Sequence, residues 1–188
     1  MTTTPSAPTK KKATFNTLSV SEVRALTSDS VEVSFAIPPE LQDDYDYIPG
    51  QYVALRATID GQEVRRSYSI CDVPRDGVLR VAIKRDRGGV FSTWANDTLQ
   101  PGDTMDVMNP QGAFTSKTHL TGLNNPEAVR EELEKLENPH LVAIAAGSGI
   151  TPIMAIAQTV LHSSPDTTFE LIFANKGGGD AVSYTHLR

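Results

Sequence analysis

The hydrophobic pattern of the chain changes at His140, and this change limits what the chain can fold into. From about Thr14 to Thr118, short segments such as SVEVSFAIP alternate apolar and polar residues and are separated by turn signals. Such alternation is typical of antiparallel strands with one buried face. After His140 the apolar run LVAIAA is continuous, as in a parallel strand buried on both faces. The sequence therefore predicts an antiparallel sandwich or barrel followed by a parallel α/β unit.

The second unit has the pattern of one β-α-β motif. LVAIAA leads into GSGITP, then into the apolar helical segment IMAIAQTVL and the second apolar strand TTFELIFANK. Two parallel strands and one helix are too few for an independent sheet domain. We therefore expect residues 139–188 to form part of a larger domain.

A helical segment is predicted between the two units. In NNPEAVREELEKLEN, Asn125 is a candidate N-cap and Pro126 a candidate first helical residue. Val129, Leu133 and Leu136 then fall at i, i+4 and i+7 on one helical face. We predict an acidic helical linker over residues 120–138.

These patterns give the expected order of parts along the chain. A Thr/Pro/Lys-rich leader at 1–13 is expected to be disordered. The β-domain then covers 14–119, the linker 120–138 and the partial α/β domain 139–188.

Composition excludes several classes of function. The formal net charge is −6, which argues against a general nucleic-acid binder. Cys71 is the only cysteine, so no internal disulfide can form. No apolar run is long enough to span a membrane, and the N-terminus lacks the apolar region of a signal peptide. The four histidines show no metal-ligand spacing. We expect a cytoplasmic protein without a metal site in this chain.

The segment AAGSGITP is a candidate nucleotide site. It places Gly147 and Gly149 where a strand meets a helix, so that the backbone can approach a phosphate and the helix N-terminus can attract it. Thr151 adds a hydroxyl. The third glycine of the commonest dinucleotide fingerprint is missing, and many helices begin after glycine for packing reasons. Both interpretations stay open on this segment alone.

A second glycine-rich segment, RGGVFSTWAND, precedes a predicted short helix. Gly88 and Gly89 come directly before that helix, which contains Ser92 and Trp94. Paired glycines before a helix can bind a phosphate-sized anion, and an ordinary turn explains them as well.

The stretch RRSYSI combines residue types that one flat, phosphorylated ligand would need. On a strand, Arg66 and Tyr68 share one face, whereas Ser67 and Ser69 lie on the other. A tyrosine can stack on a planar heterocycle, and an arginine two residues away can bind a phosphate. A flavin nucleotide offers both groups. An exposed strand with ordinary polar residues is the alternative.

Five motifs occur in the order found in the ferredoxin–NADP reductase superfamily. RRSYS contains that family's R-x-Y-S motif, and the others are PGQY at 49–52, GGVFS at 88–92, NPQGAF at 109–114 and GSGITP at 147–152. Over about residues 14–180 the chain resembles this superfamily, most closely the oxygenase reductases that include the reductase component of phenylacetyl-CoA epoxidase. The resemblance implies a flavin-binding, antiparallel Greek-key β-barrel. The first β-α-β unit of a parallel-sheet, nicotinamide-nucleotide-binding domain would follow it.

The resemblance also implies roles for residues of the barrel. Arg66 would bind the flavin phosphate, Tyr68 would stack on the isoalloxazine ring, and Ser69 would hydrogen-bond near its reactive nitrogen. Ile83 and Lys84 would line the cofactor through their main chain. Cys71 is interpreted as a small buried strand residue.

Two glycine-rich loops would hold the nucleotides in this family. Gly88, Gly89 and Ser92 would hold the pyrophosphate at a helix start, which favours FAD over FMN. The residues expected to meet NAD(P)H are Gly147, Gly149 and Thr151, with Thr151 close to the flavin.

The implied function is a flavin-dependent oxidoreductase. It would pass electrons from NAD(P)H through FAD to an iron–sulfur centre, as the reductase component of an oxygenase of the type used in phenylacetate catabolism. Its partners would be the nicotinamide nucleotide and an iron–sulfur domain or oxygenase component that accepts electrons. No side chain is expected to act as a catalytic acid, base or nucleophile, because the cofactor carries the redox chemistry.

The chain also departs from the family pattern. The later C-G-x-x motif is absent, and a [2Fe–2S] domain needs four cysteines whereas the chain has one. A [2Fe–2S] cluster is therefore expected only in a part that this chain lacks. Lys176 favours NADPH over NADH. The alternatives are a truncated flavin-binding module without turnover, a flavohaemoprotein-type or ferredoxin/flavodoxin reductase, and an unrelated β-barrel binding module.

Overall fold

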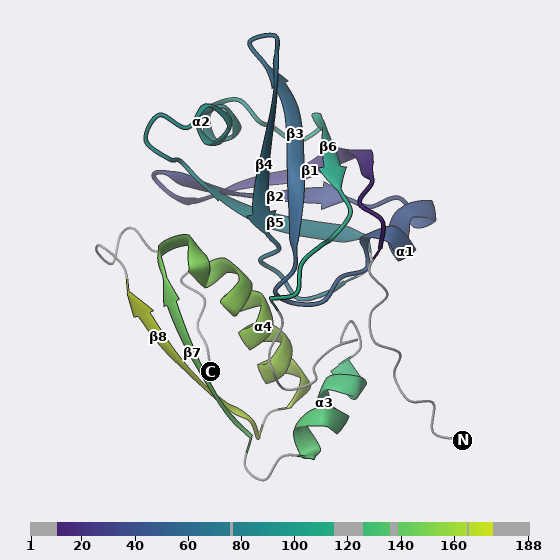
Figure 1. Ribbon diagram of the computed structural model, residues 1–188, viewed down its shortest axis with the longest axis vertical. Helices are drawn as coiled ribbons and strands as arrows, with labels where there is room; N and C mark the ends of the chain where they lie inside the picture. Colours follow the sequence, from purple (N-terminus) through teal and green to yellow (C-terminus); the bar gives the residue numbers. More distant parts are fainter. Residues whose placement is uncertain (1–10, 76, 115–125, 136–138, 165, 175–188) are drawn as a thin grey trace.

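The structure is a computed structural model (Figure 1). It describes residues 11–75, 77–114, 126–135, 139–164 and 166–174. The leader up to residue 10 and the tail from 175 onwards, with Lys176, lie outside these ranges.

The first part of the chain forms one curled antiparallel sheet of six strands, in the order β4-β3-β6-β1-β2-β5. The strands are β1 (Phe15–Thr27), β2 (Ser30–Ala36), β3 (Tyr52–Ile59), β4 (Gln62–Ser69), β5 (Val78–Lys84) and β6 (Thr104–Met108). The two edges of the sheet approach each other where Ile70, just after β4, forms a bridge with Val81 of β5. There the Cys71 N–H also donates to the Arg80 carbonyl at 3.1 Å. The predicted antiparallel barrel is thus confirmed.

The β3–β4 hairpin follows from the Asp60-Gly61 dipeptide. Asp60 has φ +50° and Gly61 has φ +75°, the positive values that a two-residue type I′ turn requires. The turn fixes the register, with Ile59 opposite Gln62. Every following residue of β4 therefore has a defined partner on β3, and the arginine–tyrosine stretch has a fixed orientation.

The barrel core consists of the inward-facing residues of the strands and of helix α2 (Val90–Asp97). In β5, Leu79, Val81 and Ile83 are buried and alternate with partly exposed residues, as the pattern GVLRVAIKR predicts. Phe91 of α2 is 1 % exposed and belongs to the same cluster. Burial of one such ring contributes about 1.5–3 kcal/mol, so α2 is an integral part of the barrel.

A short helical stretch joins β2 to β3. It consists of the 3₁₀-helix η1 (Pro39–Leu41) and α1 (Gln42–Tyr45). The Tyr45 hydroxyl donates to the Val107 carbonyl at 2.6 Å and fixes this stretch to β6.

The second part contains α3 (Pro126–Glu134), β7 (His140–Ala146), the 3₁₀-helix η2 (Gly147–Gly149), α4 (Ile150–Ser163) and β8 (Thr168–Ala174). β7 and β8 are parallel, with His140 opposite Thr168 and Ala146 opposite Ala174. The predicted β-α-β unit is confirmed.

The continuous burial predicted for the two parallel strands holds on one face only. α4 covers the face that carries Leu141 and Phe169. On the opposite face Val142, Ile144 and Ile172 are 55 %, 76 % and 52 % exposed. The reason is that no described element packs on that face, so its apolar side chains remain open to solvent.

The acidic segment before β7 is more than a surface linker. Val129 and Leu133 of α3 are fully buried against Ile156 and Val160 of α4. The predicted apolar face is therefore real, and α3 forms a layer on α4. The predicted N-cap, Asn125, and the third residue of the predicted face, Leu136, lie outside the described residues.

The beginning of α4 packs directly against the barrel. Leu26 of β1 and Ala82 of β5 contact the buried cluster that includes Ile150 and Met154 of α4. This contact brings the GSGITP turn to the barrel wall. In Figure 1 the arrowheads of β7 and β8 point toward the side of the barrel where α2 lies.

Candidate functional site

Tyr68 of the R-x-Y-S strand begins a row of three aromatic rings. Tyr68 is half-buried, and its ring centroid lies 5.8 Å from that of Phe91 in α2, at an interplanar angle of 35°. Phe91 in turn lies 5.6 Å from Trp94 in an edge-on contact. This aromatic row connects strand β4 to helix α2 and brings the R-x-Y-S motif beside the GGVFS motif.

The two neighbouring arginines lie on opposite faces of β4. Arg65 donates to the Met108 sulfur at 3.3 Å, and its guanidinium lies 5.0 Å from the Phe15 ring. Arg66 is exposed on the face of Tyr68, and its guanidinium donates to the Arg65 carbonyl at 2.7 Å. Arg66 is therefore the arginine that can share a ligand with Tyr68.

The phenol of Tyr68 is held in its neutral form. The pKa of Tyr68 is raised to about 12, first by burial and then by the charge of Asp86, while the nearby Arg66 acts to lower it. A neutral, half-buried aromatic ring is suited to stacking on a flat, electron-poor heterocycle. Asp86 had no assigned part in the sequence reasoning, since its proximity to Tyr68 arises only in three dimensions.

Three other barrel residues predicted for the site, Ser69, Ile83 and Lys84, make contacts within the protein. Ser69 pairs with Tyr52 at the end of β4 and is half-buried. The Ile83 side chain is fully buried, so only its main chain can face a ligand, and its carbonyl accepts a bond from Asn96 at 3.2 Å. Lys84 forms an ion pair with Asp29 at 3.5 Å.

The loop before α2 is organised around Ser92. Its hydroxyl accepts a bond from the Asp86 N–H at 3.0 Å and donates to the Gly89 carbonyl at 3.3 Å. Gly88 has φ +76°, and a Cβ on Gly89 would lie 2.5 Å from the Ser92 oxygen. Ser92 thus shapes the loop, while the first N–H groups of α2 are the donors left for an anion.

The GSGITP turn lies at the start of α4. Gly147 has φ +52°, both Gly147 and Gly149 are exposed, and a Cβ on either would meet nothing within 4 Å. Thr151 is 5 % exposed, and its hydroxyl donates to the Ser148 carbonyl at 2.8 Å. The exposed part of this turn is therefore its backbone. The buried Thr151 stabilises the turn through its bond to Ser148.

Cys71 directly follows the R-x-Y-S strand. Burial raises the pKa of the Cys71 thiol, and the charges of Glu32 and Asp72 raise it further. A thiol that resists ionisation is a poor nucleophile and metal ligand, which fits an unreactive Cys71. The predicted buried strand position is wrong, because β4 ends at Ser69 and Cys71 beyond it is half-buried.

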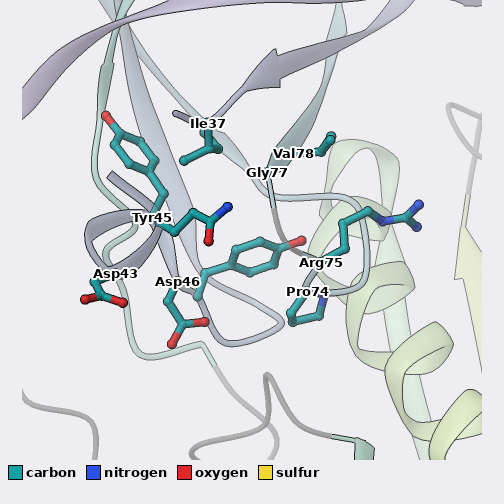
Figure 2. Close-up of a pocket in the computed structure, with 10 residues that line it drawn as sticks. Ile37, Asp43, Tyr45, Asp46, Pro74, Arg75, Gly77 and Val78 are labelled. Atoms are coloured by element: carbon teal, nitrogen blue, oxygen red, sulfur yellow. The ribbon is translucent and has the colours of Figure 1, made fainter. Parts of the chain in front are cut away.

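A separate cavity of about 370 Å³ lies beside α1 (Figure 2). Tyr45, Asp43 and Asp46 line it on one side, and Pro74 and Arg75 on the other. None of the predicted site residues belongs to its lining.

The described part of the chain has neither a metal cluster nor a membrane-spanning helix. Within it, no group of three or more His, Cys, Asp or Glu side chains is placed to hold a metal ion. None of the described helices has the length and apolar character that a membrane span requires.

Comparisons with known proteins place the barrel in a family. Residues 17–116 match the oxidoreductase FAD-binding domain. The chain is 41 % identical over 163 residues to one subunit of the 1,2-phenylacetyl-CoA epoxidase from Escherichia coli K12, covering 87 % of this chain and 42 % of that protein. It is 32 % identical over 173 residues to the ferredoxin reductase component of 3-ketosteroid-9-alpha-monooxygenase from Rhodococcus rhodochrous, covering 91 % and 44 %. The chain thus spans less than half the length of these curated relatives.

Solved structures share the fold. The Amycolatopsis cytochrome P450 reductase matches with a TM-score of 0.69 and 26 % identity, over 94 % of this chain and 46 % of that one. The FAD/NAD-binding domain of nitric oxide dioxygenase from Vibrio cholerae matches with a TM-score of 0.69 and 22 % identity, over 87 % and 64 %. Both similarities extend over the barrel and the β-α-β unit.

Proposed function

Because the chain belongs to the oxidoreductase FAD-binding domain family, within the ferredoxin–NADP reductase superfamily, we propose that it takes electrons from NAD(P)H through FAD as the reductase component of an oxygenase. Residues 14–119 are then the FAD-binding domain, and residues 139–188 are part of the NAD(P)-binding domain. The electron acceptor is an iron–sulfur centre in a separate domain or protein. The names of the epoxidase and monooxygenase relatives support an oxygenase partner.

One observation carries this proposal. The Tyr68–Phe91 contact of 5.8 Å brings the R-x-Y-S strand beside the GGVFS loop, although 23 positions separate these residues in the sequence. A half-buried aromatic face, the exposed Arg66 and the N-terminus of α2 then lie on one side of the barrel. Together they offer a stacking surface and two sites for phosphate, which fits a dinucleotide flavin.

The residues have distinct proposed tasks. Tyr68 supports the flat ring, while Arg66 and the N–H groups at the start of α2 bind the phosphates. The exposed backbone of Gly147–Gly149 takes the nicotinamide nucleotide at the start of α4. FAD, when bound, supplies the exchange between two-electron and one-electron chemistry, and the chain's own residues bind and orient the two nucleotides.

The proposal is tested by titrating the purified chain with FAD and FMN, then adding NADPH or NADH without oxygen. Stoichiometric FAD uptake, followed by bleaching of the flavin absorbance, is the expected result for the reductase. A chain that takes up no flavin contradicts the proposal and favours an unrelated binding barrel.

A second candidate is a flavin-binding module without turnover. The exposed apolar face of β7 and β8 favours it, because parallel sheets are normally covered on both faces. In that case FAD binds normally and bleaching by NAD(P)H is slow or absent. A longer protein that contains this chain is then expected to bleach at a normal rate.

A further inference from the structure

The turn at residues 48–52, IPGQY, lies between the end of the R-x-Y-S strand β4 and helix α4. The Gln51 carbonyl accepts a bond from the Ile70 N–H at 2.9 Å, directly after the R-x-Y-S strand. On its other side, the turn reaches α4 through Gly50, since a Cβ at Gly50 would lie 3.4 Å from Ile156.

The same turn also binds the segment after β6. Tyr52 and Gln111 exchange two backbone hydrogen bonds of 2.9 Å each. The Gln51 side chain donates to the Gly112 carbonyl at 3.2 Å and accepts from the Ile48 N–H at 2.9 Å. This segment leads on to Phe114, whose carbonyl lies against Gly50.

Gly50 permits this close packing. It has φ +99°, and an added Cβ would lie 1.7 Å from the Phe114 carbonyl oxygen, far inside the 3.0 Å approach of real Cβ atoms. The atom in the way belongs to the backbone, so a side-chain rotation cannot relieve the clash. Any larger residue must therefore displace the turn and residue 114 from each other, and the turn is the part that also faces Ile156 of α4.

We propose that Gly50 and Gln51 are positioning residues that set the spacing between the flavin strand β4 and the middle of helix α4 at Ile156, and through the helix the place of its nucleotide-binding start. This inference rests on the proposed function for its catalytic meaning. Its structural content, a path of neighbouring residues from Ile70 through residues 50–51 to Ile156, stands without it. Hydride transfer is sensitive to placement, and an error of about 1 Å can cost on the order of 100-fold in rate.

The experiment compares Gly50→Ala with Gly102→Ala in the whole chain. Gly102 is a matched control, because its φ is +97° and an added Cβ meets nothing within 4 Å. Both variants introduce the same backbone strain, and only Gly50→Ala introduces the clash. Hydrogen–deuterium exchange then reports the opening of each element, with β2 as the internal reference.

We expect Gly50→Ala to raise exchange in α4 about tenfold relative to β2, and Gly102→Ala to leave that ratio within about twofold. Unchanged exchange in α4 for Gly50→Ala, or an equal rise for Gly102→Ala, overturns the inference. If Gly50→Ala does not fold, Gln51→Ala decides by the same criterion, since it removes only the bonds to Ile48 and Gly112.

A second arm measures flavin chemistry in the FAD-loaded chain. Gly50→Ala is expected to retain FAD while the limiting rate of reduction by NAD(P)H falls about 10- to 100-fold, with half-saturation changed by less than about threefold. An unchanged limiting rate contradicts the positioning role. Failure of FAD uptake in the wild-type chain contradicts the proposed function instead, and the exchange arm still decides this inference.

Discussion

The sequence predicts on which face of strand β4 Arg65 and Arg66 each lie. Strand alternation predicts opposite faces for them, and the structure places Arg65 against Phe15 and Met108 while Arg66 lies on the Tyr68 side. Strand alternation could not predict the hydrogen-bond partners of the Ser92 and Thr151 hydroxyls. Ser92 and Thr151 have their hydroxyls bonded within their own loops, because loop geometry, which sequence spacing does not specify, decides their partners.

Arg66→Ala tests the proposed phosphate contact. Loss of a charge-assisted hydrogen bond costs about 1.5–3 kcal/mol, which corresponds to about 10- to 100-fold weaker FAD binding. Arg65→Ala is the matched control, since it removes the neighbouring arginine from the opposite face, and it is expected to change affinity by less than about threefold. Equal affinities for both variants in a flavin titration would refute the role of Arg66.

At the scale of the element, α2 with its preceding loop is the part that joins core and site. Phe91 faces the core. At the helix start, Asp86 and Gly89 of the loop and Ser92 of the first helical turn form a closed set of hydrogen bonds. The sequence indicated the glycines and the helix. It did not indicate that the Ser92 hydroxyl bonds to the backbone of Asp86 and Gly89, because those bonds depend on the folded path of the loop.

Gly89→Ala tests this loop. The new Cβ would lie 2.5 Å from the Ser92 oxygen and must displace it, breaking the bonds to Asp86 and Gly89. We expect FAD binding to weaken about tenfold, the equivalent of roughly one hydrogen bond.

Gly61→Ala serves as the control for that measurement. Gly61 lies at the tip of the β3–β4 hairpin with φ +75°, and an added Cβ has open space around it. Isothermal titration with FAD should show an unchanged affinity for Gly61→Ala. A normal affinity for Gly89→Ala would show that the loop does not contact the cofactor.

At the scale of the whole molecule, one buried and two half-buried groups link stability to alkaline pH. Burial is the first cause that raises the pKa of Tyr47, of Tyr68 (to about 12) and of the Cys71 thiol. The folded protein therefore keeps these protons at pH values where the unfolded chain has released them. Their contribution to stability is complete below the unfolded values of 9.0 for cysteine and 10.0 for tyrosine, and it is lost as pH rises through the folded values.

We accordingly expect the free energy of unfolding to fall steadily above about pH 9. Urea denaturation followed by the fluorescence of Trp94, the only tryptophan of the chain, measures it. Tyr68→Phe should make the fall between about pH 10 and pH 12 less steep. A stability that is constant up to pH 12, or an identical slope in Tyr68→Phe, would contradict the assignment.

The sequence by itself determined the order of the elements. Periodicity of two, the Asp60-Gly61 turn and the continuous apolar run after His140 are local properties, so they indicate an antiparallel sandwich or barrel and a β-α-β unit without reference to distant residues. The tertiary structure alone decided which distant residues meet. The Tyr68–Phe91 contact and the packing of Gly50 against residue 114 and α4 depend on how the sheet curls and how the second unit docks. These are sums of many weak contacts between distant segments, and no local pattern in the chain encodes them.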